Sequence, residues 1–168
     1  MKIGILGGSF DPAHKGHLAI SKEARKRFKL EKIIWVITKK NPLKAESKTP
    51  ISKKIKDCKK IIGLNSFIKV KFYENIIKSN KTIDLINYLK KNKNIEIFFL
   101  MGADNLISFH KWHKSKLISQ KCNIIVFDRH GYKKNSLKSK TFKRLNNKTL
   151  TFVEFKKVNI SSSQLRKI

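Results

Sequence analysis

The sequence predicts an α/β protein with a doubly wound, mainly parallel sheet and helices on both faces. Two patterns support this prediction. Apolar segments of strand length alternate along the chain with segments whose apolar residues recur every three or four positions, as in amphipathic helices. The strand-length segments are nearly continuously apolar, which is typical of strands buried on both faces of a parallel sheet. Ligands of such sheets bind beyond the carboxyl ends of the strands, where the strand order reverses.

The first strand and the first helix enclose a loop that carries glycine and histidine. The opening apolar segment is expected to end at Gly7-Gly8, and after a loop closed by Pro12 a helix is predicted over residues 17–28. This order of strand, turn and helix places a helix N-terminus beside an anion. His14 and His17 enter the helix, where two imidazoles could donate to phosphate oxygens. The plainer alternative is that the glycines serve the turn and the histidines are structural.

Apolar periodicity, together with capping and turn residues, predicts the remaining helices and strands. Thr49 and Pro50 have the residue types of an N-cap and a first helical position, before a helix with an apolar stripe over residues 51–62. Residues 128–147 are polar and lysine-rich and are expected to form a loop with weak helix. Further strands are predicted at residues 32–38, 67–73, 95–101, 123–127 and 150–155. Further helices are predicted at residues 82–91, around Phe109 and Trp112, and from Ile160 onward.

Length and composition fit one domain over residues 1–168. Hydrophobic residues make up 40% of the chain, which excludes a disordered tail. No apolar run is long enough to cross a membrane, and Asp11 closely follows the short apolar N-terminal stretch, so we expect neither a membrane span nor a secretory signal. Cys58 and Cys122 lack metal-ligand spacing, which favours a reduced, cytoplasmic protein without a metal site of its own.

The formal net charge of +29 allows two interpretations. The lysines are spread over nearly every segment, whereas a localised patch is the better sign of a nucleic-acid footprint. A solvated lysine surface without a specific nucleic-acid partner is therefore favoured, and a basic nucleic-acid-binding module is the alternative. A basic surface would also speed the arrival of anionic substrates.

The first loop resembles the signature of the nucleotidyltransferase α/β-phosphodiesterase superfamily in its string GGSFDPAHKGH, residues 7–17. In that superfamily His-x-Gly-His opens the first helix and holds the triphosphate of a nucleotide. The resemblance implies a Rossmann-like fold with His14 and His17 as catalytic residues. It also implies contacts to ATP from Gly8, Ser9, Phe10, His14 and His17.

Three further regions extend the resemblance over essentially the whole chain. The strings FLMGADNLISFHKW (residues 99–112) and CNIIVFDRHGY (residues 122–132) resemble bacterial nicotinate-nucleotide adenylyltransferases in particular. The strings ISSSQLR (residues 160–166) and NPLK (residues 41–44) resemble motifs that also suit the related pantetheine-phosphate adenylyltransferases.

The C-terminal motif has the chemistry of a phosphate clamp. Ser161 and Gln164 are spaced as a capping box, Ser162 and Ser163 add hydroxyl donors, and Arg166 adds a planar fork for phosphate oxygens. A plain capped helix is the alternative. Beside a His-x-Gly-His loop, binding of ATP by Ser161, Ser162, Ser163 and Arg166 is favoured.

Gly102 and Asp104 follow a predicted strand end, where a carboxylate can accept from ribose hydroxyls of ATP. Capping of the next helix by Asp104 is the alternative, and both roles are compatible. Trp112 resembles the aromatic platform on which the family stacks the pyridine ring, with core packing as its alternative. With these residues, the expected set for nicotinate mononucleotide is Asn41, Lys44, Lys81, Thr82 and Trp112.

The chain departs from the family pattern at three places. Asn80-Lys81-Thr82 stands where the family has Ser-Tyr-Thr, and His113 stands where a tyrosine is usual. The sequence ends at Ile168, directly after the signature, so the C-terminal helical segment usual in the family is expected to be missing.

The resemblance implies adenylyl transfer from ATP to nicotinate mononucleotide in NAD synthesis, with Mg²⁺ as the cofactor that accompanies ATP. The alternatives are a pantetheine-phosphate adenylyltransferase, which the regions around Trp112 and Arg129 oppose, and a nucleic-acid-binding protein with a relict fold. The sequence leaves homo-oligomerisation open.

Overall fold

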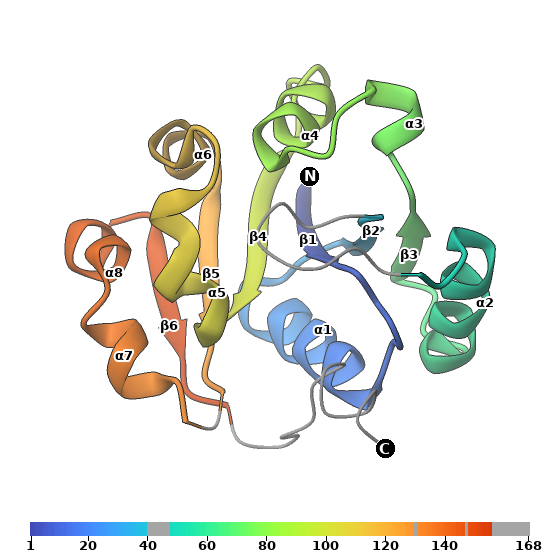
Figure 1. The fold of residues 1–168 in the computed structure, drawn as a ribbon, viewed down its shortest axis with the longest axis horizontal. Coiled ribbons are helices and arrows are strands. Elements are labelled where there is room, and N and C mark those ends of the chain that lie inside the picture. The colour runs from blue at the N-terminus through green and yellow to red at the C-terminus, as the bar shows by residue number, and fades with distance from the viewer. Residues whose placement is uncertain (40–47, 130, 147, 156–168) are drawn as a thin grey trace.

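The described part of the chain forms one six-stranded sheet, in which every neighbouring pair of strands is parallel (Figure 1). The structure is a computed structural model that describes residues 1–39, 48–129, 131–146 and 148–155. The strand order is β3-β2-β1-β4-β5-β6, so it reverses between β1 and β4, and the prediction of a doubly wound parallel sheet is confirmed. The strands are β1 (Lys2–Gly8), β2 (Lys32–Ile37), β3 (Ile68–Lys71), β4 (Glu96–Gly102), β5 (Asn123–Phe127) and β6 (Leu150–Val153).

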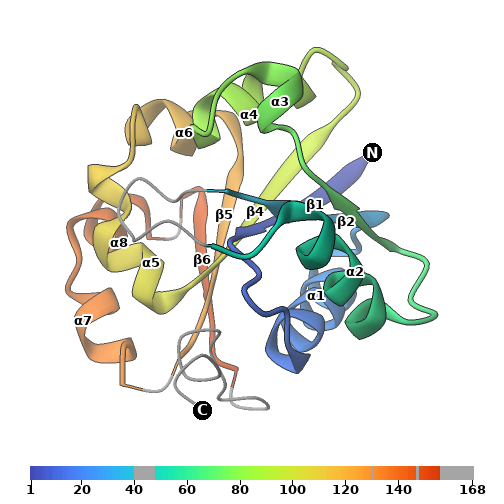
Figure 2. The ribbon, with the colours of Figure 1, turned by 45° about the vertical axis from the view of Figure 1, so that its right-hand side comes forward.

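Helices cover both faces of the sheet (Figure 2). One face packs against α1 (Lys15–Phe28) and α2 (Ile51–Ile62). The other face packs against α4 (Thr82–Leu89) and its neighbours. These neighbours are α3 (Glu74–Ile77), α5 (Ala103–Ser108), the 3-10 helix η1 (Phe109–Lys111), α6 (Ser115–Lys121) and α8 (Lys140–Leu145). A further short helix, α7 (Lys133–Leu137), contacts α5 and α8.

Alternate residues of the strands fill two separate cores. In β1, Ile3 and Ile5 belong to the core beneath α4, whereas Leu6 belongs to the core beneath α1. A Cβ at Gly4 would lie 2.9 Å from Cδ1 of Leu30, so glycine lets the segment after α1 pack closely on the strand. Because both faces are covered, the central strands are apolar at nearly every position.

Two boundaries differ from the prediction near the first loop. β1 continues through Gly7 and Gly8, which align with Val36 and Ile37 of β2, because the parallel neighbour supplies hydrogen bonds to this end. Neither glycine has a positive φ; the left-handed residue of the loop is Phe10, at φ 47°. The helix begins at Lys15 rather than His17.

Further corrections concern the short helices. The predicted strand 67–73 is shorter, and α3 follows it. The stretch 128–147, expected to be mainly loop, contains α7 and α8, and the Ser139 hydroxyl caps α8 by accepting from the Phe142 N–H. Trp112 lies just after η1 rather than within a helix. The helix expected from Ile160 lies outside the described residues.

The described sheet edge at β3 carries exposed Lys69 and Lys71, whose charges disfavour pairing with another strand. Among the described residues, we find no helix with the length and apolar character needed to cross a membrane.

Candidate active site

The carboxyl ends of β1 and β4 flank the point where the strand order reverses. β1 ends at Gly8 and leads into the loop before α1, while β4 ends at Gly102 and leads directly into α5. β2 ends nearby at Ile37. The carboxyl ends of these three strands therefore share one edge of the sheet, and this edge holds the candidate site.

Two histidines form a capping box at the start of α1. His14 is the N-cap, and its Nδ1 accepts from the Gly16 N–H over 3.0 Å. His17 Nδ1 accepts in turn from the His14 N–H over 3.1 Å, and the two ring centroids lie 3.9 Å apart. Because each Nδ1 is an acceptor, each neutral ring carries its proton on Nε2. Both side chains therefore present an Nε2–H donor.

Burial keeps these two imidazoles uncharged. It lowers the pKa of His14 to about 4, and the positive charge of Arg129 adds to the effect. The pKa of His17 also lies well below its usual range, first because of burial and then because of the charges of His14 and Arg129. His14 Nε2 is buried and has no hydrogen-bond partner among the described residues. A buried donor of this kind is costly unless a ligand or water accepts from it.

The His17 ring is held by two aromatic side chains. Phe10 lies with its ring centroid 4.6 Å from that of His17, and Trp35 lies at 5.7 Å. The Trp35 indole donates to the Ser21 hydroxyl over 2.8 Å, and that hydroxyl donates to the His17 carbonyl over 2.8 Å. Phe10, an expected ATP contact, thus buries its side chain against His17 and Trp35. Gly8 and Ser9 precede it at the partly exposed end of β1.

A second polar group lies at the end of β4. Arg129 Nη1 donates to Asp104 Oδ2 over 2.7 Å, and Asp104 Oδ1 is buried without a partner among the described residues. A Cβ at Gly102 would lie 2.6 Å from Asp104 Oδ1, so a side chain there would push the carboxylate out of this position. Gly102 itself is the N-cap of α5, and no side chain caps this helix, so the capping role considered for Asp104 is wrong.

The set of expected site residues omits Arg129. Its charge lowers the pKa of His14 and His17, which shows that it lies close to both histidines. The available signal was its place two residues after β5, at the same sheet edge as the other site loops.

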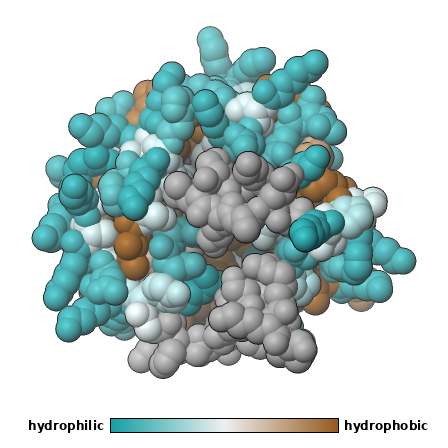
Figure 3. All heavy atoms as spheres, in the orientation of Figure 1, coloured by the Kyte–Doolittle hydropathy of each residue, from teal (hydrophilic) through white to brown (hydrophobic). Residues whose placement is uncertain are grey.

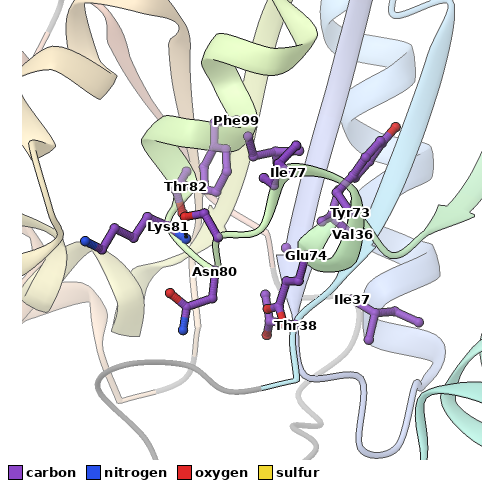
Figure 4. A pocket seen from close by; sticks show the side chains of 13 residues that line it. Val36, Ile37, Thr38, Tyr73, Glu74, Ile77, Asn80, Lys81, Thr82 and Phe99 are labelled. Carbon is purple, nitrogen blue, oxygen red and sulfur yellow. Dashed lines mark hydrogen bonds between the residues drawn. The ribbon is translucent and has the colours of Figure 1, made fainter.

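A pocket lies between the strand ends and the start of α4 (Figure 4). Lys81 and Thr82 line it, together with Gly7 and Phe99, which were not among the expected contacts of nicotinate mononucleotide. Its other lining residues are Val36, Ile37, Thr38, Tyr73, Glu74, Ile77, Ser79, Asn80 and Leu85. Figure 4 shows Asn80, Lys81 and Thr82 on one side, with Glu74 and Thr38 on another.

Glu74 places a carboxyl group in the pocket wall. Its Oε1 accepts from the Lys39 N–H over 3.2 Å. Burial raises the pKa of Glu74, while this hydrogen bond and the charges of Lys54 and Lys39 oppose the shift.

Trp112 is half-buried beside the pocket wall. Its ring meets Phe99 edge-on at a centroid distance of 5.9 Å and lies 5.1 Å from Phe109. Trp112 packs against the core beneath α4, which agrees with the core-packing interpretation. Its contact with Phe99 also links it to a residue that lines the pocket.

Six expected site residues lie outside the described part of the chain: Asn41, Lys44, Ser161, Ser162, Ser163 and Arg166. The described residues bring together His14 and His17, place Asp104 near them through Arg129, and place Lys81 and Thr82 in one pocket. Outside its grey atoms, the molecular face in Figure 3 is mostly hydrophilic, in agreement with a lysine-rich surface.

Comparison with known proteins gives consistent results. The model of the cytidylyltransferase-like family matches residues 5–168. A Pelagibacter ubique protein named "Probable nicotinate-nucleotide adenylyltransferase" is 67% identical, over 99% of this chain and 93% of its own length. A Rhizobium johnstonii protein of the same name is 33% identical, over 83% of this chain and 71% of its own length.

The fold is also shared with a solved structure. Plasmodium falciparum nicotinic acid mononucleotide adenylyltransferase complexed with NaAD superposes with a TM-score of 0.79. The match covers 99% of this chain and 82% of that one, at 23% identity, and it supports the fold. From the family model and the curated relatives, this chain belongs to the cytidylyltransferase-like family and stands among its nicotinate-nucleotide adenylyltransferases.

Proposed function

We propose that this chain transfers the adenylyl group of ATP to nicotinate mononucleotide, giving nicotinate adenine dinucleotide and pyrophosphate in NAD synthesis. The observation that carries the proposal is the pair of neutral imidazoles at the start of α1, one of them with a buried Nε2 that lacks a described partner. The names of the curated relatives supply the reaction.

The start of α1 suits a triphosphate. Its first turn contains no acidic residue, so the helix dipole faces an anion without a competing carboxylate there, although the Gly16 and His17 N–H groups are already bonded to His14. Nε2–H of His14 and of His17 would add two side-chain donors to the phosphate oxygens. Because these donors are neutral, the site stabilises negative charge through oriented dipoles that are already in place.

The reaction needs no covalent enzyme intermediate. A phosphate oxygen of nicotinate mononucleotide attacks the α-phosphorus of ATP in line, and a new P–O bond forms. The bond from the α-phosphorus to the bridging oxygen breaks, and pyrophosphate leaves with that electron pair. We assign to His17 the stabilisation of charge that develops on the α-phosphate, and to His14 a hold on the triphosphate. Positioning and charge stabilisation supply the catalysis, as in phosphoryl transfer generally.

The pocket at the start of α4 suits the nicotinate group. Apolar walls from Val36, Leu85 and Phe99 fit a flat ring, and Trp112 adds an aromatic face next to Phe99. The first N–H groups of α4, near Thr82, would donate to the ring's carboxylate, while Asp84 in the same turn accepts from the Ser79 hydroxyl. Lys81 is exposed and would contribute a weak, screened attraction.

The remaining expected site residues are assigned either to ATP or to nicotinate mononucleotide. Asp104, with a buried Oδ1 and a bond to Arg129, would accept from the ribose of ATP beside Gly102. Asn41, Lys44, Ser161, Ser162, Ser163 and Arg166 stay predictions. Mg²⁺ would arrive with ATP, neutralise part of the phosphate charge and require few protein ligands. No three His, Cys, Asp or Glu side chains converge on a metal position in the described ranges.

A pyrophosphate-release assay tests the proposal. The protein is incubated with Mg-ATP and, separately, with nicotinate mononucleotide, nicotinamide mononucleotide or phosphopantetheine. We expect the fastest release with nicotinate mononucleotide. Preferred release with phosphopantetheine would contradict the proposal in favour of the related adenylyltransferases. No release with any acceptor, together with RNA or DNA binding that persists at physiological salt, would favour the nucleic-acid-binding alternative.

A further inference from the structure

A hydrogen bond joins the loop before α1 to the chain that leads into α2. Thr49 was the expected N-cap of α2, but Pro50 holds that position and no side chain caps the helix. The Thr49 hydroxyl instead donates to Asp11 Oδ1 over 2.6 Å, across 38 residues of sequence. A hydroxyl donor to a carboxylate forms a short, charge-assisted bond, which is stronger than a bond between neutral groups.

The two partners differ in how firmly the fold holds them. Asp11 lies in the stretch between β1 and α1, three residues before the N-cap His14. This stretch has a turn but no strand or helix, so no ladder of backbone hydrogen bonds fixes its path, and a side-chain bond can contribute to it. Thr49 lies two residues before α2, which buries Cys58 and Ile62 in the core beneath α1. The hydrogen bond thus attaches an irregular segment to a helix that is packed on the sheet.

The neighbours of Asp11 show why its position matters for the site. Phe10 precedes it with φ at 47°, a conformation that costs a bulky residue energy, and packs its ring against His17. The Phe10 ring is anchored in the core, and the partly buried bond from Thr49 holds the next residue of the loop.

We propose that Thr49 is a positioning residue for the nucleotide: through Asp11 it holds the loop that presents the two histidines to the triphosphate. The proposal rests on the proposed function for its effect on catalysis. Its effect on the loop is independent of any reaction. Misplacing catalytic groups by about 1 Å can cost roughly a hundredfold in rate, so a single lost tether can have a large effect.

Two substitutions at Thr49 separate the effect of its hydroxyl group from the effect of its branched shape. Thr49→Val keeps the branched shape and removes the donor, whereas Thr49→Ser keeps the donor. Thr151→Val is the matched control, because Thr151 is exposed on β6 and distant in sequence from Asp11 and Thr49. Three quantities are measured: hydrogen exchange of the amides of residues 9–14, the dissociation constant of Mg-ATP by calorimetry, and kcat and KM with both substrates.

We expect Thr49→Val to exchange faster over residues 9–14 and to lose about tenfold in kcat/KM for ATP, in line with the loss of one hydrogen bond to a charged group. Its KM for nicotinate mononucleotide should change little. Thr49→Ser should restore the parent's values, and Thr151→Val should match the parent throughout. In a double-mutant cycle with Asp11→Asn, the two changes should be clearly non-additive, because they remove one shared bond.

The result that would overturn the proposal is a Thr49→Val protein with the parent's exchange over residues 9–14. Equal and additive losses in the cycle, or a Thr49→Ser protein as impaired as Thr49→Val, would overturn it too. If the parent protein fails to transfer the adenylyl group to nicotinate mononucleotide, the proposed function falls, while the exchange data and the ATP dissociation constant still decide the role of Thr49.

Discussion

The guanidinium of Arg129 donates to the carboxylate of Asp104 over 2.7 Å and so joins the segment after β5 to the first turn of α5. The same positive charge also lowers the pKa of His14 and His17 at the start of α1. One arginine therefore connects the two halves of the site that meet where the strand order reverses. Removing Arg129 should therefore alter both halves of the site.

Arg129→Ala should raise the pKa of His14 and of His17, because a nearby positive charge that disfavours protonation is lost. Burial, the larger cause, persists, so both pKa values should stay below 6.5. NMR titration of the imidazole signals measures the change. Arg27→Ala, which removes an exposed arginine paired with Glu23, is the control and should leave both values as they are. Unaltered values in Arg129→Ala would show that the charge acts elsewhere.

His17→Ala should lower kcat by roughly two to three orders of magnitude with little loss of ATP affinity, as for removal of one preorganised donor. The substitution also breaks the capping box of α1. His17→Gln separates these effects, because a glutamine at this third helical position can still accept from the capping residue. Exposed His113→Ala is the control. A kcat of His17→Ala equal to that of the parent would contradict the role of His17 in stabilising charge on the α-phosphate.

Stability should fall as the pH is lowered from about 6.5 to about 4. The pKa of His14 is about 4 in the folded chain and near 6.5 when unfolded, so between these values the unfolded chain binds more protons. Urea unfolding at several pH values measures this slope. His14→Asn keeps an N-cap acceptor and should show a shallower slope than the parent. A steep slope that survives in His14→Asn would assign it to other groups.

The parent should use nicotinate mononucleotide in preference to nicotinamide mononucleotide, because the start of α4 offers donors to a carboxylate. Lys81→Ala should reduce this preference by no more than about fivefold, since the lysine is exposed. Trp112→Ala should weaken both acceptors by roughly tenfold if the indole stacks on the ring. The measurement is kcat/KM for each acceptor. Lys78→Ala, an exposed lysine that does not line the pocket, serves as the control.

Equal use of both acceptors by the parent would refute the preference for the acid. An unchanged ratio of the two kcat/KM values in Lys81→Ala would show that this lysine does not contribute to the choice of acceptor.

The lysine surface should bind duplex DNA or RNA weakly, without sequence preference and with a steep dependence on salt, because a dispersed charge acts through counterion release alone. Titration of labelled duplexes between low and physiological salt measures this. Tight binding at physiological salt would contradict a merely solvated surface.

Periodicity in the sequence was sufficient for the order and type of the main strands and helices. Strands buried on both faces must be apolar at nearly every position, and this pattern marks β2, β4 and β5 without reference to the rest of the fold. The short helix α3 was missed, and α7 and α8 were expected only as weak helix within a loop, since four to six residues are too few to show a period and their stability comes from packing.

The sequence by itself determined the chemistry of the first loop: two histidines three residues apart, after a strand and before a helix. It did not determine their partners. That each Nδ1 accepts a backbone N–H, that Arg129 reaches Asp104, and that the Thr49 hydroxyl donates to Asp11 rather than capping α2 were decided by the tertiary structure. The physical reason is that local spacing controls helix caps and strand patterns, whereas contacts across 25 or 38 residues depend on how the sheet brings distant loops to one edge.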